Sequence, residues 1–175
     1  MDFADTIKNR RSIRTYKKQE IPQETINQLI EAARLAPSAG NAQSWAFVIV
    51  REQENKQALS NAALNQRSIV EASAVFVVCA DEKRAKESYG DRGKTLYCLQ
   101  DTAAASQNIL LTACSLGLGS CWIGAFKEDE VRKIVNAPKE MRPVVIIPVG
   151  YPNESPRART RRPVSEIVHQ ETFQH

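Results

Sequence analysis

Two short segments concentrate positive charge, and their arginines could grip a phosphate group. Residues 8–18 contain six basic side chains and no acid, and residues 157–163 contain four arginines and no acid. Guanidinium groups bind phosphate oxygens through paired hydrogen bonds, and hydroxylic residues such as Ser12 lie among the arginines. Each segment taken alone is more typical of a solvated charged surface, and a phosphate clamp is the alternative.

The rest of the chain does not have the composition of a general polyanion-binding protein. The net charge is +4, and outside the two basic segments 14 basic residues stand against 20 acidic ones. A nucleic-acid-binding surface typically spreads basic residues along a stripe, with aromatic residues between them. We therefore expect no nucleic acid partner, although a non-catalytic binder of a nucleotide or nucleic acid remains an alternative.

A polar turn and a strand end offer further contacts for a flat ligand. Residues 36–43 (APSAGNAQ) place short polar side chains directly before the apolar run at 45–50. Such a turn could hydrogen-bond the edge of a heterocycle, although an ordinary turn has the same composition. Similarly, Trp122-Ile123-Gly124 could simply end a strand, but its glycine would let a planar ligand lie against the backbone.

The sequence lacks the side chains of several common catalytic sites. Its two histidines, His169 and His175, both lie near the C-terminus, so neither a histidine-based zinc site nor a Ser-His-Asp triad is expected. The four cysteines form no CxxC pair, and their apolar or small neighbours indicate reduced, mostly buried thiols. We therefore expect no metal and assign no catalytic side chain.

The glycines do not form a dinucleotide-binding or triphosphate-binding motif. Gly117-Leu118-Gly119 follows a predicted helix and precedes a strand, whereas the dinucleotide fingerprint needs glycines in a strand-to-helix turn. The sequence also contains no GxxxxGK[ST] motif. Neither a Rossmann dehydrogenase nor a P-loop nucleotide triphosphatase is predicted.

The elements that must position these residues alternate along the chain. Helical periodicity and short apolar runs predict helices over about 2–9, 22–36, 54–64, 95–116 and 127–135, and strands over 45–50, 74–80, 119–123, 144–149 and, at an edge, 164–168. Residues 81–95 are polar and contain Gly90 and Gly93, which predicts a loop. The alternation of predicted helices and strands would by itself favour a parallel α/β sheet.

Length and hydropathy predict one domain that does not cross a membrane. The 175 residues fall within the usual range for one domain. The longest apolar runs reach about half of the ~20 residues that a membrane-spanning helix needs. The N-terminus has no signal-peptide core. We expect a single domain over 1–175, no membrane partner and a cytoplasmic location.

Four motifs, in this order, resemble the nitroreductase family of FMN-dependent NAD(P)H oxidoreductases. They are RRSIRTY at 10–16, APSAGNAQSW at 36–45, LGLGSCWIG at 116–124 and the arginines before Pro163. Their joint occurrence is far more specific than any one of them. The resemblance implies FMN as cofactor, NAD(P)H as electron donor, and hydride transfer through flavin N5 to nitroaromatic, quinone or similar planar acceptors.

The same resemblance assigns the phosphate end of the cofactor to the two basic segments. Arg10, Arg11 and Ser12 match the residues that hold the FMN phosphate and ribityl chain. Arg159 and Arg161 match the basic pair that completes the phosphate site. The arginine that follows this pair would replace its second member if the register shifted by one residue.

The ring end of the cofactor is assigned to three other segments. Arg14 matches the basic residue on the N1/O2 side of the isoalloxazine, and Asn65 matches a ring-contacting asparagine. The loop that reaches the flavin from the other protomer is matched by Pro37, Ser38, Ala39, Asn41 and Gln43. The strip beside the ring, where a backbone N–H points toward N5, is matched by Trp122, Ile123 and Gly124.

The resemblance also replaces the parallel sheet with another fold. It implies a three-layer α+β sandwich whose largely antiparallel central sheet is flanked by helices. It implies a homodimer that exchanges C-terminal arms, here about 152–175, and so forms composite sites. A specialised flavoenzyme of the same fold, catalysing reductive dehalogenation or flavin fragmentation, is the alternative function. The short 81–95 segment, with Tyr89 and Arg92, implies an open acceptor pocket.

Overall fold

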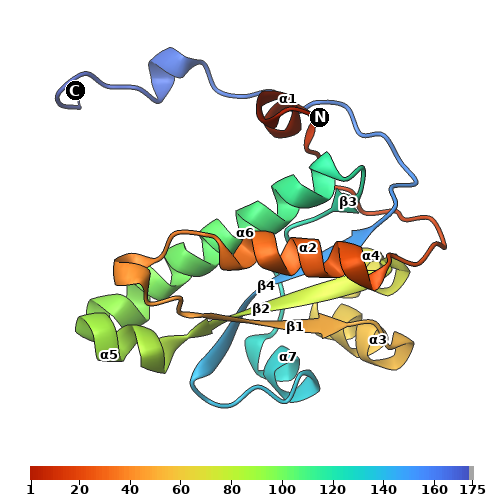
Figure 1. Ribbon diagram of the computed structural model, residues 1–175, viewed down its shortest axis with the longest axis horizontal. Coiled ribbons are helices and arrows are strands. Elements are labelled where there is room, and N and C mark those ends of the chain that lie inside the picture. The colour runs from red at the N-terminus through yellow and green to blue at the C-terminus, as the bar shows by residue number, and fades with distance from the viewer. Residues whose placement is uncertain (174–175) are drawn as a thin grey trace.

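The computed structural model describes residues 1–173 and contains an α+β fold (Figure 1). Its α-helices are α1 (Phe3–Asn9), α2 (Gln23–Arg34), α3 (Gln53–Ala62), α4 (Arg67–Glu71), α5 (Glu82–Arg92), α6 (Cys98–Ser115) and α7 (Glu128–Ile134). Its strands are β1 (Trp45–Val50), β2 (Ala74–Asp81), β3 (Gly119–Ser120) and β4 (Met141–Gly150). Short helical turns occupy η1 (Ala39–Asn41), η2 (Gly93–Tyr97) and η3 (Val164–Glu166).

The central sheet is antiparallel throughout the described residues. Its strand order is β1-β2-β4-β3, and each neighbouring pair runs antiparallel. The parallel sheet that alternation favours is therefore wrong, and the antiparallel sheet implied by the family resemblance is confirmed. The alternation misled because β2 is buried on both faces, so its apolar run resembles that of a parallel strand.

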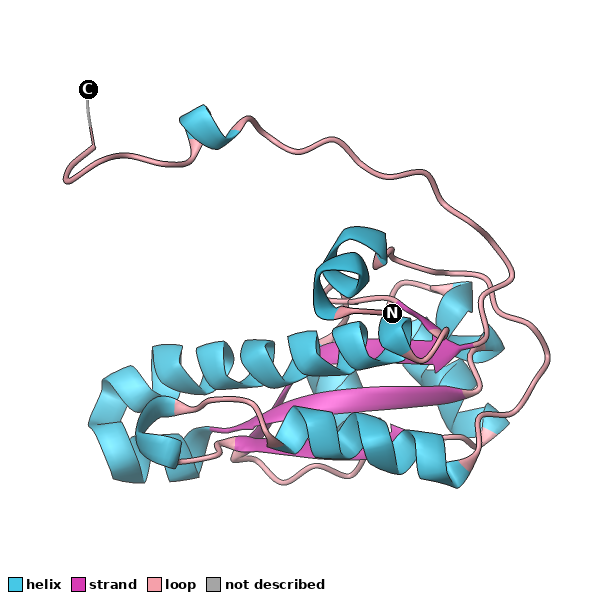
Figure 2. Ribbon diagram, turned by 45° about the horizontal axis from the view of Figure 1, so that its top comes forward, coloured by secondary structure: helices cyan, strands magenta, loops and turns pink. Residues whose placement is uncertain are grey.

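Helices cover both faces of the sheet and form a three-layer sandwich (Figures 1 and 2). Alternate residues of a strand point to opposite faces, so Phe76 packs toward α2 and α6, whereas Val77 packs toward α3, α4 and α7. Both side chains are fully buried. Among residues 1–173, none of the helices combines the length and apolar character needed to cross a membrane.

The segment 81–95 is helical, so the predicted loop is wrong. Asp81 caps α5 by accepting a hydrogen bond from the Arg84 amide at 2.9 Å. Gly90 has φ of 58° at a kink within α5, while Gly93 has helical φ and ψ and begins η2. A Cβ on Gly93 would lie 2.1 Å from the Ala85 carbonyl oxygen, so this glycine permits close packing.

The C-terminal segment leaves the body of the molecule after β4 and extends past α1 (Figures 1 and 2). Residues 164–168, predicted as an edge strand, contain η3 instead. Pro163 precedes this turn, and Arg162 pairs with Glu166 across it at 3.0 Å, which favours a helical spacing. The last two residues of the predicted arm lie outside the described residues.

Other predicted elements agree with the structure except at their ends. The predicted 119–123 strand is confined to β3, although Ile123 forms an isolated bridge with Ile146. The predicted 95–116 helix begins as the π-helical turn η2 and continues as α6. Helix α4 was not predicted, because five residues are too few to display helical periodicity.

Candidate functional site

The two basic segments, about 140 residues apart in sequence, lie side by side. The chain after β4 runs antiparallel to residues 15–17: the Lys17 amide donates to the Tyr151 carbonyl, and the Asn153 amide to the Thr15 carbonyl, both at 2.9 Å. The Glu154 carboxylate accepts hydrogen bonds from the amides of Arg14 and Thr15. These contacts fix the start of the C-terminal arm against the first basic segment.

Beyond this junction the two segments enclose a small cavity of 250 Å³. We call it the arginine cavity; its lining residues are Arg10, Arg11, Ser12, Arg14, Pro156, Arg157, Arg159 and Arg161. Six guanidinium groups and one hydroxyl line it, and no carboxylate is among these residues. This donor set fits a phosphate group, whose oxygens accept several charge-assisted hydrogen bonds.

The alternation of the C-terminal arginines determines which of them face the arginine cavity. Arg157, Arg159 and Arg161 line it, and residues two apart share a face in an extended chain. Arg162 does not line it and instead bonds the Glu166 carboxylate at 3.0 Å. The structure therefore places Arg161 beside the cavity, in the register predicted first. Arg157 was not among the predicted site residues, although its spacing could have identified it.

The RRSIR segment also lies beside the predicted ring-contacting strip. Ser12 forms a parallel bridge with Ser120, and the Ile13 amide donates to the Ser120 carbonyl at 2.9 Å. A Cβ on Gly119 would lie 2.7 Å from Cγ2 of Ile13, so only glycine permits this approach. Residues 12–14 therefore run next to 120–122, and the two predicted motifs meet.

The predicted strip itself alternates between exposed and buried residues. Trp122 is 41% exposed, and Ile123 is buried and exchanges backbone hydrogen bonds with Ile146. Gly124 is exposed. Next to it, the Gln66 side-chain amide donates to the Ala125 carbonyl at 3.4 Å. This contact brings the turn that contains Asn65 close to the strip.

Two ionisable groups beneath the strip are held neutral. Tyr16 is buried, its hydroxyl donates to the Ile13 carbonyl at 2.6 Å, and burial raises its pKa above the ordinary tyrosine value. Burial likewise raises the pKa of the Cys121 thiol. A neutral phenol and a neutral thiol support the backbone of Ile13 and its neighbours without adding charge to the site.

The predicted loop 37–43 is fixed at one end of α6. Asp101 of α6 is buried, and its two carboxylate oxygens accept hydrogen bonds from the Ala39 amide at 3.0 Å and the Ser44 hydroxyl at 2.7 Å. The Ser38 hydroxyl accepts from the Gln43 amide at 2.9 Å. Pro37 precedes these contacts and is exposed.

This loop has an unusual backbone and leaves its side chains accessible. Gly40, Asn41 and Gln43 have φ of 51°, 58° and 52°, in the left-handed region that few side chains favour. Asn41 is exposed, and the Gln43 side-chain amide donates to the Asn41 carbonyl at 3.3 Å. Helix α5 supports the loop, because the Arg84 guanidinium donates to the Ala42 carbonyl.

Within a single chain, the loop 37–43 lies far from the arginine cavity. The loop is held by Asp101, while Cys114, near the other end of α6, lines a shallow cavity together with Arg10 and Arg11. A helix rises 1.5 Å per residue, so the 13 residues between Asp101 and Cys114 span about 20 Å. Figure 1 accordingly shows α5 and α1 at opposite ends of α6. Sequence reasoning missed Asp101, whose signal is that it is the one charged residue of α6.

Comparison with known proteins identifies the class of protein that this fold and site define. The model of the nitroreductase family matches residues 7–151, so the chain belongs to this family of oxidoreductases. A protein of Archaeoglobus fulgidus is 39% identical over 152 residues, covering 85% of this chain and 84% of that protein. The FMN reductase (NADPH) of Bacillus subtilis is 30% identical over 182 residues, covering 97% and 73%.

A solved structure shows the same fold. The NADPH:FMN oxidoreductase from Vibrio harveyi, in complex with NAD+, superposes with a TM-score of 0.91 at 28% identity. The superposition covers 99% of this chain and 78% of the Vibrio chain. The three-layer α+β sandwich is therefore the nitroreductase fold.

Proposed function

We propose that this protein is an FMN-dependent NAD(P)H oxidoreductase that reduces nitroaromatic, quinone or similar planar acceptors. The observation that carries the proposal is the arginine cavity, where two distant segments supply six guanidinium groups and the Ser12 hydroxyl. The names of the Bacillus and Vibrio relatives, both reductases that involve FMN, support the same reading.

In this proposal the cavity residues hold the FMN phosphate and the adjacent strip supports the ring. Arg10, Arg11 and Ser12 bind the phosphate and ribityl chain from one side, and Arg159 and Arg161 close the phosphate site from the other. The arginines supply charge-assisted hydrogen bonds to phosphate oxygens.

The ring end of the proposed site uses the neighbouring strip. Arg14 stabilises negative charge on the N1/O2 side of the ring, and Asn65 contacts the ring edge. Trp122, Ile123 and Gly124 provide backbone beside the ring. FMN, when bound, supplies the hydride chemistry, so the protein contributes binding, orientation and electrostatics and needs no catalytic side chain.

The proposed functional unit is a homodimer with two composite sites. The loop containing Pro37, Ser38, Ala39, Asn41 and Gln43 lies about 20 Å along α6 from the arginine cavity, and a second copy could supply it. Apolar residues exposed on α1 and on the C-terminal arm support such an association. Phe3 is 72% exposed, Val164 70% and Ile167 57%.

Steady-state kinetics test the acceptor class. FMN-loaded protein is mixed with NADH or NADPH, and nicotinamide oxidation is followed with and without a nitrobenzene or a benzoquinone. We expect the acceptors to increase turnover strongly. A flavin-containing protein that turns over neither acceptor would contradict this substrate class and favour the specialised flavoenzyme instead. Flavin-independent, salt-sensitive binding of an oligonucleotide would favour the non-catalytic binder.

A further inference from the structure

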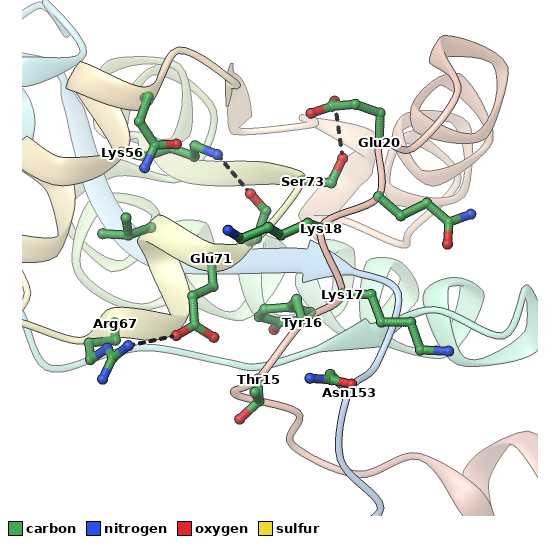
Figure 3. Close-up of a pocket in the computed structure, with 14 residues that line it drawn as sticks. Thr15, Tyr16, Lys17, Lys18, Glu20, Lys56, Arg67, Glu71, Ser73 and Asn153 are labelled. Carbon is green, nitrogen blue, oxygen red and sulfur yellow. Dashed lines mark hydrogen bonds and ion pairs between the residues drawn. The ribbon is translucent and has the colours of Figure 1, made fainter.

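A second and larger cavity, of 720 Å³, shares no lining residue with the arginine cavity (Figure 3). We call it the lysine cavity. Its walls come from residues 15–20, from α3 and α4 with the chain up to Ser73, and from Asn153. No residue assigned above to the flavin lines it. Its polar side chains are therefore free for a different ligand.

The carboxylates of the lysine cavity already have cationic partners. Glu20 bonds the Arg51 guanidinium at 2.6 Å, and this hydrogen bond lowers the pKa of Glu20. Glu71 pairs with Arg67 at 3.4 Å. Each of these carboxylates is therefore paired with an arginine, and neither forms an ion pair with a lysine of the cavity.

Lys56 is the most unusual of these lysines. The residue is only 7% exposed, and its ammonium donates one hydrogen bond, to the Ala72 carbonyl at 2.8 Å. An ammonium carries three N–H donors, and within residues 1–173 no carboxylate lies within 4.0 Å of this one. Burial lowers its pKa, the expected response of an under-compensated buried cation.

Lys18 adds a second cation to the same space. Figure 3 shows its side chain extending between Glu71 and Lys56, whereas Lys17 points away from both. Lys18 forms no ion pair within 4.0 Å in the described chain. Amide donors on Gln53 and Asn153 also line the cavity. Two ammonium groups that pair with no carboxylate of residues 1–173 within 4.0 Å and two neutral amide donors therefore line one cavity.

We propose that the lysine cavity binds a phosphate monoester, with Lys18 and Lys56 as its principal cationic contacts. A phosphate monoester carries between one and two negative charges near neutral pH and offers three acceptor oxygens, which match two ammonium groups and the neighbouring amides. Two sources have this chemistry: the 2′-phosphate of NADPH and a separate phosphorylated metabolite. The first source rests on the proposed oxidoreductase function, and the second does not.

A titration of FMN-loaded protein with inorganic phosphate, followed by ¹⁵N amide spectra, tests the site. FMN is added before phosphate because, if the proposed function is correct, its phosphate group then occupies the arginine cavity. We expect saturable shifts at the amides of Lys18, Lys56 and Ser73. Lys18→Gln and Lys56→Met should each weaken phosphate binding about tenfold, the loss typical of one charge-assisted hydrogen bond. The matched control, Lys133→Met on α7 outside the cavity, should not change it.

Each outcome has a distinct meaning. The absence of saturable shifts at these amides, or unchanged affinity in both variants, would overturn the proposal. Because Lys18 is exposed, its variant tests the site even if Lys56→Met fails to fold. If the Lys18→Gln variant has a higher Michaelis constant for NADPH but not for NADH, the phosphate bound in the lysine cavity is the 2′-phosphate of NADPH. If the variant binds phosphate more weakly but its Michaelis constants for NADPH and NADH are unchanged, the natural ligand of the cavity is a separate phosphorylated metabolite. Failure to take up FMN is detected independently, by the missing flavin absorption.

Discussion

The Ser44 hydroxyl donates a hydrogen bond of 2.7 Å to the Asp101 carboxylate inside the protein core. The other oxygen of this carboxylate accepts a hydrogen bond from the Ala39 amide, so one buried side chain of α6 holds both ends of the segment 39–44. Asp101→Ala should lower the free energy of unfolding by about 1–3 kcal/mol, because it leaves two donors without their acceptor. Urea unfolding measures this change, and Asp129→Ala on the exposed face of α7 is the control.

The same substitution tests whether this loop belongs to the flavin site. If it does, Asp101→Ala should also weaken FMN binding, while Asp101→Asn, which keeps one carbonyl acceptor, should weaken it less. Flavin fluorescence measures the dissociation constant. If Asp101→Ala destabilises the protein but leaves its FMN affinity unchanged, the loop 37–43 does not contribute to the flavin site.

Arginine substitutions test the phosphate assignment. Arg10→Ala, Arg157→Ala and Arg159→Ala should each weaken FMN binding about 10- to 100-fold, since each removes a charge-assisted contact, and should leave the thermal midpoint nearly unchanged. Arg162→Ala is the matched control because Arg162 pairs with Glu166 outside the cavity. Full flavin occupancy in the Arg10 and Arg159 variants would reject the assignment.

Mixed dimers test the composite site. Arg10→Ala damages the arginine cavity, whereas Asn41→Gly removes a loop side chain at a position whose φ of 58° glycine tolerates. If each site combines the cavity of one chain with the loop of the other, a heterodimer of the two variants contains one intact site and one doubly damaged site. Its activity should approach half of the wild-type activity. Activity no higher than the mean of the two variant homodimers would place both segments in one chain's site.

Gly40 and Tyr89 give a test of how α5 supports the loop. A Cβ on Gly40 would lie 1.9 Å from the Tyr89 hydroxyl oxygen, and Gly40 has φ of 51°. Gly40→Ala should lower the free energy of unfolding by about 1–2 kcal/mol, from left-handed strain and from displacement of Tyr89. In a Tyr89→Ala background only the strain remains, so the cost should fall toward about 1 kcal/mol. An identical cost in both backgrounds would show that the two residues do not interact.

The ion pair of Glu128 and Arg142 predicts a pH dependence of stability. Arg142 bonds both carboxylate oxygens, at 2.8 and 2.9 Å, and lowers the pKa of Glu128 below the ordinary value of 4.5. Because the side chains are 41% and 38% exposed, solvent screens the pair, and Glu128→Gln should cost about 0.5–1 kcal/mol at pH 7.

The sign of this dependence follows from the depressed pKa. The stabilisation is complete above pH 4.5 and is lost as the pH falls through the lower folded-state pKa. The free energies of unfolding of the wild type and Glu128→Gln should therefore converge once the pH falls below the folded-state pKa of Glu128. If the two proteins still differ in free energy of unfolding at that low pH, the stabilising effect of Glu128 comes from packing and not from its charge. Glu54→Gln, on an exposed carboxylate of α3, is the control.

Local pattern was sufficient to predict most elements, and the family resemblance was needed for the topology. Helical periodicity located α2 and a short apolar run located β1, because those signals act within a few residues. Strand direction could not be predicted from pattern, since β2 is buried on both faces and carries no alternation. Gly93 was misread as a loop signal, because its need to avoid Ala85 becomes visible only in the packed structure.

The candidate site shows a similar limit. The composition identified two basic segments, but their meeting depends on the Tyr16 to Pro152 bridge and on Glu154, contacts that join residues more than 130 positions apart. The alternation of Arg157, Arg159 and Arg161 was visible in the sequence, whereas its orientation toward the cavity was not. The loop at 37–43 could be named from a motif, but its distance from the arginines required the structure.

The most direct test of the central claim is an absorption spectrum of the purified protein after addition of FMN and removal of unbound flavin, followed by anaerobic titration with NADH and NADPH. We expect a yellow protein that retains one FMN per chain and loses its oxidised-flavin absorption in proportion to the nucleotide added. A colourless protein that does not retain FMN, or a bound flavin that stays oxidised with both nucleotides, would contradict the proposed function.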